Sequence, residues 1–177
     1  MLKAVLFDFG GTLDCDGEPW LDRFARLYLA AGLRAGPDEL RGAFYDADDR
    51  LSQRFRLEGL DLAETVLLQA GCVVERLDPG NAGLARAVAS RFVDDARAQI
   101  SLNLSFLERL RGRYRLGIVS NFYGNLEGLI RREGLGHVFE AIADSGRLGV
   151  LKPDPALFLH AADRLGALAS ECLMVGD

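Results

Sequence analysis

Apolar positions along the chain follow two periods, one typical of buried strands and one typical of helices. Four short segments have the length and the apolar, β-branched composition of buried strands: residues 4–7, 114–119, 139–143 and 172–175. Helical spacing returns between the last three, at 126–134 and at 157–168. Strands that alternate with helices predict an α/β fold with a Rossmann-like parallel sheet as its core.

The segment from residue 15 to residue 100 shows helical spacing only. We expect four helices there, at about 20–31, 37–55, 62–70 and 84–98, with glycines at 32 and 71 ending the first and third. A further short helix is expected at 105–111. The chain is thus predicted to consist of a core, residues 1–14 and 101–177, and a helical insertion, residues 15–100.

Composition narrows the class of protein. Hydrophobic residues make up 49% of the chain, which is enough for a sizeable core, and the net charge of −5 argues against a nucleic-acid partner. Three cysteines without metal-ligand spacing fit a reduced cytoplasm. No leader and no membrane-spanning stretch are recognised. We therefore expect a cytoplasmic protein with no membrane partner, and the sequence leaves its oligomeric state open.

The first predicted strand ends in a carboxylate. Asp8 follows the buried run 4–7, where a charge needs a partner or a metal ion. Gly10 and Gly11 then let the backbone approach a ligand closely, and Thr12 adds a hydroxyl and a backbone N–H. Open parallel sheets bind ligands at the carboxyl ends of their strands, so this turn is the expected site.

The hexapeptide that runs from Asp8 to Leu13 resembles the first motif of the haloacid dehalogenase-like (HAD) hydrolases, Asp-x-Asp-x-Thr. The resemblance implies that Asp8 is the nucleophile that takes up a phosphoryl group and that Gly11 and Thr12 bind the phosphate. The second aspartate of the motif is the usual general acid/base, and Gly10 stands in its place. We therefore expect a preference for good leaving groups, as in aryl or acyl phosphates.

Two later segments resemble the second and third motifs of the same family. Ser120 and Asn121 follow the second strand, where family members bind the transferring phosphate with a hydroxyl and a backbone N–H. Lys152, followed by Pro153, matches the catalytic lysine that neutralises the nucleophile and the phosphate. The resemblance gives Lys152 both a catalytic and a phosphate-binding role.

The last two residues, Gly176 and Asp177, resemble the opening of the fourth motif, whose acids hold Mg²⁺. The implied metal site consists of Asp8, the backbone carbonyl of Gly10, and Asp177. Family domains continue with another helix and an outer strand, so strand 172–175 is expected at an exposed sheet edge. The insertion, residues 15–100, resembles the small helical cap of one HAD subfamily.

The resemblance implies a Mg²⁺-dependent phosphatase that hydrolyses a small phosphorylated metabolite through an aspartyl-phosphate on Asp8. Two alternatives stay open. A 2-haloacid dehalogenase would use Asp8 to displace halide and needs no acid at position 10. A catalytically degenerate HAD module would bind phosphate or a partner protein, and Gly10 and the early C-terminus favour that reading.

Other charged residues are candidates for supporting roles. Asp14 and Asp16 lie just beyond Gly10 and could supply the missing acid, although we expect the linker to direct them to solvent. Arginines of the insertion could meet an anionic substrate, but are expected to solvate outer helix faces: Arg41, Arg50, Arg54, Arg56 and Arg91. Phe44 and Phe55 are expected in the core of the insertion.

Overall fold

The computed structural model describes residues 1–176, and its core is a parallel four-stranded sheet in the order β3-β2-β1-β4. The strands are β1 (Ala4–Phe7), β2 (Arg115–Ser120), β3 (Ala141–Asp144) and β4 (Cys172–Val175). The central strand β1 pairs with β2 and β4, with Ala4 opposite both Arg115 and Cys172. Every residue of β1 is buried, because it has a neighbour on both edges and helices over both faces.

The two faces of the sheet bury different sets of side chains. Val5 and Phe7 of β1 belong to one large apolar cluster, which also holds residues of α4 (Ala82–Arg111) and α5 (Leu126–Arg132). Ala4 and Leu6 point to the other face, where α7 (Pro155–Arg164) covers them. This alternation is that of a strand buried on both faces.

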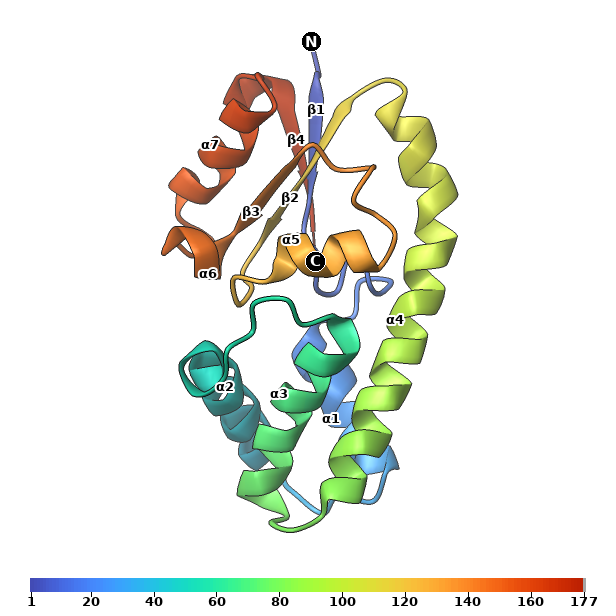
Figure 1. The fold of residues 1–177 in the computed structure, drawn as a ribbon, viewed down its shortest axis with the longest axis vertical. Coiled ribbons are helices and arrows are strands. Elements are labelled where there is room, and N and C mark those ends of the chain that lie inside the picture. Colours follow the sequence, from blue (N-terminus) through green and yellow to red (C-terminus); the bar gives the residue numbers. More distant parts are fainter. Residues whose placement is uncertain (177) are drawn as a thin grey trace.

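Beyond the carboxyl ends of the strands lies a bundle of helices (Figure 1). Its members are α1 (Trp20–Ala30), α2 (Pro37–Arg54), α3 (Leu62–Leu77) and the first part of α4. Their facing sides carry buried apolar residues, among them Phe24, Leu51, Val66 and Phe92. The helices thus form a cap over the sheet end where Asp8 lies, and the α/β fold class with its helical cap is confirmed.

Helix α4 differs from the sequence-based expectation of two helices separated near residue 101. It is one helix of 30 residues that begins in the cap and runs alongside the sheet (Figure 1). The expected break near residue 101 does not occur, because the buried positions Ile100 and Leu107 continue one apolar stripe across it. The expected division between residues 100 and 101 therefore falls inside α4.

Helix α3 also runs further than predicted, through Gly71 to Leu77. Gly71 lacks the positive φ that ends α1 at Gly32, where φ is +95°. Val73 and Val74 beyond it are buried, so tertiary packing overrides the helix-breaking tendency of glycine.

The remaining elements are short. Helix α6 (Ser145–Leu148) follows β3, and a 3₁₀ turn, η1 (Ala169–Glu171), leads into β4. Within residues 1–176, β4 pairs with β1 alone and forms an edge of the sheet, as expected. No helix in this part of the chain has both the length and the apolar character needed to cross a membrane.

Candidate active site

Asp8 lies at the carboxyl end of β1, and both of its carboxylate oxygens are engaged. Oδ1 accepts hydrogen bonds from the Ser120 hydroxyl and from the backbone N–H of Phe9, each at 2.7 Å. The Lys152 ammonium forms an ion pair with Oδ2. The side chains of Asp8 and Lys152 are only 13% and 21% exposed. The structure thus brings together three predicted residues that are 144 positions apart at most.

The loop that carries Lys152 is held by the loop that follows β2. The Asn121 side-chain oxygen accepts the backbone N–H of Lys152 at 2.7 Å. On the other side of Lys152, Asp154 caps α7 by accepting the N–H of Ala156 at 2.9 Å. The backbone N–H of Asn121 itself has no acceptor within residues 1–176. It is therefore available to an anionic ligand beside Ser120.

A cavity of about 270 Å³ opens over Asp8, between the sheet and the cap. Ser120, Lys152 and Gly10 line it together with Asp8. Five aromatic residues form much of its walls: Trp20, Phe44, Tyr45, Phe122 and Tyr123. Among its described lining residues, Asp48 is the only carboxylate besides Asp8. The cavity therefore combines a charged end with aromatic walls and one acid from the cap.

Gly11 and Thr12, predicted to bind phosphate, do not line this cavity. The N–H of Gly11 donates to Asp14 Oδ1 at 2.8 Å, and that of Thr12 to the Phe9 carbonyl at 3.2 Å. The Thr12 hydroxyl is buried and has no partner within residues 1–176. Their phosphate-binding role stays a prediction, and neither backbone N–H is free in this structure.

The predicted metal site is only partly within the described residues. Residues 1–176 contain no cluster of three or more His, Cys, Asp or Glu side chains that could hold a metal. Mg²⁺ commonly binds through one or two carboxylates, waters and substrate phosphate, so the Asp8 carboxylate beside Gly10 fits this ion. A Cβ placed on Gly176 would lie 3.5 Å from Asp8 Cβ, so β4 leads the chain to Asp8. Asp177, the third predicted ligand, lies outside the described residues.

The expectation that Asp14 points to solvent is wrong. Asp14 is 0% exposed, and its Oδ2 accepts the Trp20 indole N–H at 2.7 Å and an Arg23 N–H at 3.2 Å. Burial raises the pKa of Asp14 to about 6, against the lowering effect of Arg23 and the N–H donors. Asp14 is thus a buried residue that connects the loop after β1 to α1. Asp16 is exposed, as expected.

Trp20 occupies the space that a side chain at position 10 would need. A Cβ placed on Gly10 would lie 3.1 Å from Trp20 Cδ1 and Nε1, closer than ordinary van der Waals contact. The indole is fixed by its hydrogen bond to Asp14 and by edge contacts with Phe24 and Phe92. A side chain at position 10 would therefore require the Trp20 ring to move by a few tenths of an ångström.

The cap arginines are outside the cavity over Asp8. Four of them pair with acids on outer surfaces, as expected for solvated helix faces: Arg50 with Asp46, Arg54 with Glu75, Arg56 with Glu58 and Arg91 with Asp95. Arg41 is exposed. Phe44 is buried in the cap core, as predicted, and it also lines the cavity. Phe55 packs against the same core.

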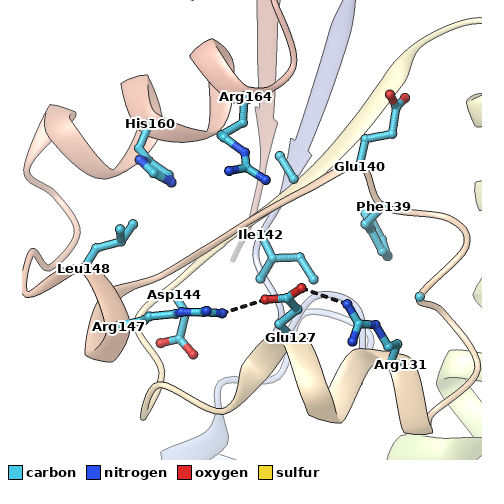
Figure 2. A pocket seen from close by; sticks show the side chains of 12 residues that line it. Glu127, Arg131, Phe139, Glu140, Ile142, Asp144, Arg147, Leu148, His160 and Arg164 are labelled. Atoms are coloured by element: carbon cyan, nitrogen blue, oxygen red, sulfur yellow. Dashed lines mark hydrogen bonds and ion pairs between the residues drawn. The ribbon is translucent and has the colours of Figure 1, made fainter.

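A larger cavity, of about 520 Å³, lies along the outer edge of β3 (Figure 2). Three of its charged lining residues pair with one another: Glu127 forms ion pairs with Arg131 at 2.9 Å and with Arg147 at 2.6 Å. Asp144 there accepts backbone N–H groups of Gly124 and Leu126 at 3.0 Å. The acids Glu127 and Asp144 of this groove thus hold neighbouring residues in place, and none of its lining residues belongs to the site predicted from the sequence.

The fold and the site together define an α/β protein in which a carboxylate, Asp8, lies at the carboxyl end of the central strand beneath a helical cap. A family model described as haloacid dehalogenase-like hydrolase matches residues 2–177. The chain therefore belongs to the haloacid dehalogenase-like hydrolases, which confirms the resemblance found in the sequence.

Individual relatives agree with this family and differ in what they are called. "Glyceraldehyde 3-phosphate phosphatase" of Methanothermobacter thermautotrophicus is 29% identical over 193 residues, covering 100% of this chain and 77% of the relative. "Haloacid dehalogenase-like hydrolase domain-containing protein 3" of Danio rerio is 48% identical over 61 residues, which is 34% of this chain and only 25% of that relative's length. A solved structure described as a dehalogenase superposes with a TM-score of 0.59 at 22% identity, covering 99% of this chain and 76% of that one.

Proposed function

We propose that this chain is a phosphatase that hydrolyses a small phosphate monoester, with Asp8 as the nucleophile. The observation that carries the proposal is the arrangement of Ser120 and Lys152 on the two oxygens of Asp8, at the reactive end of one cavity. The full-length similarity to a protein called a phosphatase supports it.

Each residue has a role that its position allows. Asp8 attacks phosphorus and forms the aspartyl-phosphate. Lys152, the Ser120 hydroxyl and the free N–H of Asn121 bind the phosphoryl oxygens and stabilise the charge that develops on them. The predicted ligands Asp8, the Gly10 carbonyl and Asp177 would hold Mg²⁺, which would supply positive charge to offset that of the nucleophile and the phosphate. The aromatic walls of the cavity hold the rest of the substrate.

A second candidate is a 2-haloacid dehalogenase, in which Asp8 displaces halide from carbon. One observation favours it: position 10 carries no acid and Trp20 lies close beside it, and halide needs no proton to leave. Lys152 beside Asp8 suits an anionic haloacid as well as it suits a phosphate.

The two candidates differ in product and in metal requirement. We expect phosphate release from 4-nitrophenyl phosphate that is lost on chelation of Mg²⁺, and no halide release from 2-chloropropionate. Asp8→Asn should abolish phosphate release while leaving the circular dichroism spectrum and Tm unchanged. The matched control is Asp16→Asn, an exposed acid outside the cavity, which should keep full activity. Metal-independent halide release would overturn the proposal in favour of the dehalogenase. Release of neither phosphate nor halide would indicate a module that binds ligands without turnover.

A further inference from the structure

Hydrolysis of an alkyl phosphate needs a proton donor for the leaving oxygen. Gly10 has no side chain to donate one, and Trp20 covers the space beside it. A chain that acts on such esters must therefore hold another acid in the cavity over Asp8.

The two acids that follow Gly10 in the sequence, Asp14 and Asp16, do not meet this need. Asp14 is enclosed, both of its oxygens accept hydrogen bonds, and it does not line the cavity. Asp16 is exposed and also lies outside the cavity wall. Proximity in sequence thus points to the wrong residues.

Asp48, on the cap helix α2, does line the cavity that holds Asp8, Ser120 and Lys152. Its Oδ1 accepts a hydrogen bond from the Tyr123 hydroxyl, whereas its Oδ2 has no partner within residues 1–176. The side chain is half-buried beside aromatic residues, and this burial raises the pKa of Asp48. It is a carboxyl group with one oxygen fixed and the other available, set opposite a nucleophile that lacks its usual acid.

We propose that Asp48 is the general acid of this site, supplying from the cap the proton that position 10 cannot supply. The inference rests on the proposed phosphatase function. As Asp8 bonds to phosphorus and the bond to the ester oxygen breaks, the proton of Asp48 passes to that oxygen and the alcohol leaves. The Asp48 carboxylate then takes a proton from the water that attacks the aspartyl-phosphate, which releases phosphate and restores both acids. Tyr123 positions Asp48 by holding its Oδ1.

The test compares two esters of similar size in wild type and in Asp48→Asn. Benzyl phosphate has a poor leaving group that needs a proton, whereas 4-nitrophenolate leaves without one. We expect kcat/KM to fall about a hundredfold or more for benzyl phosphate and less than about tenfold for 4-nitrophenyl phosphate. Tyr123→Phe should also lower kcat/KM more for benzyl phosphate than for 4-nitrophenyl phosphate, but by a smaller factor than Asp48→Asn does. Retained nitrophenyl turnover also shows that the variants are folded.

The neighbouring acid provides the matched control. Asp49→Asn makes the same charge change one residue along α2, at an exposed position outside the cavity over Asp8, and should leave both esters unaffected. Equal losses on both esters in Asp48→Asn, or no loss on either, would overturn the role of Asp48 and leave the phosphatase standing. If wild type releases phosphate from neither ester, the proposed function and the role of Asp48 both fail.

Discussion

At the scale of single residues, the loop that follows Asp8 is held by one buried ion pair, between Arg23 and Asp14. The Arg23 side chain is 1% exposed and donates to the carbonyl and carboxylate of Asp14 and to the Phe92 carbonyl, at 3.0, 3.2 and 2.6 Å. Its guanidinium also stacks over the Phe92 ring at 3.8 Å. Arg23 thus joins the loop after Asp8 to α1 and α4, and the cap is anchored where the site needs rigidity.

Replacing Arg23 should therefore be costly, because it leaves Asp14 buried without its cation. We expect Arg23→Met to lower the free energy of unfolding by about 3–5 kcal/mol. Burial raises the folded-state pKa of Asp14 to about 6 although Arg23 lowers it, so removal of Arg23 raises that pKa further. The stability that a protonated Asp14 contributes is lost as pH rises through its folded-state pKa, and without Arg23 no cation offsets the buried charge that then forms. Urea unfolding should then show a smaller loss at pH 5 than at pH 8.

The control for this experiment lies on the same helix. Arg26 pairs with Glu18 on the surface, and Arg26→Met should cost at most about 1 kcal/mol with no such pH dependence. An Arg23→Met protein as stable as wild type, or one more stable at pH 8 than at pH 5, would contradict the account of the buried pair.

Some residues of the site could be predicted from the sequence around them, and others could not. Asp8, Ser120 and Lys152 could be predicted, because each ends a strand or precedes a proline within a short motif. Asp48 could not, since its partner Tyr123 is 75 positions away. The burial of Arg23 could have been predicted, because it lies on the apolar face of a helix with Trp20, Phe24 and Leu27. A charged residue at such a position needs a buried partner.

At the scale of elements, the strands were easier to predict than the helix ends. The bounds of β1 and β4 follow directly from their apolar runs, 4–7 and 172–175. The ends of α3 and α4 do not, because local propensity at Gly71 and Ser101 is weaker than the packing of the buried stripes that continue past them. Continuity of α4 matters for the site, since Asn103 on it donates to the Leu13 carbonyl at 3.0 Å and holds the nucleophile loop.

A proline at the expected break tests whether α4 is one element. Ser101 is exposed in the middle of the helix, so Ser101→Pro removes a helical hydrogen bond without disturbing the core. We expect a loss of about 3 kcal/mol or more in the free energy of unfolding, measured by urea denaturation. Ser101→Ala should change it by less than about 0.5 kcal/mol. A proline that is tolerated as well as alanine would restore the two separate helices.

At the scale of the whole molecule, the cap and the sheet make the site jointly. The sheet supplies Asp8 and Ser120, the loop before α7 supplies Lys152, and the cap supplies Trp20, Phe44 and Asp48. Sequence patterns predicted both parts and their order along the chain. They could not predict which cap side chains face the cavity, because that depends on how α1 and α2 are rotated against the sheet end.

The sheet has an open edge at β4. In the part of the chain that the structure describes, β4 has no strand on its outer side, and Leu173 and Val175 are 49% and 36% exposed. Cys172 and Met174 point the other way, against the cluster that α7 covers. An exposed apolar edge strand is a template for pairing with another chain.

We therefore expect the 177-residue chain to self-associate at its β4 edge. Leu173→Lys should then lower its weight-average mass in light scattering. Leu159→Lys places the same charge on an equally exposed leucine of α7, at 51%, and should leave the mass unchanged. If the chain is monomeric throughout, or if both substitutions act alike, β4 is not the surface through which copies meet.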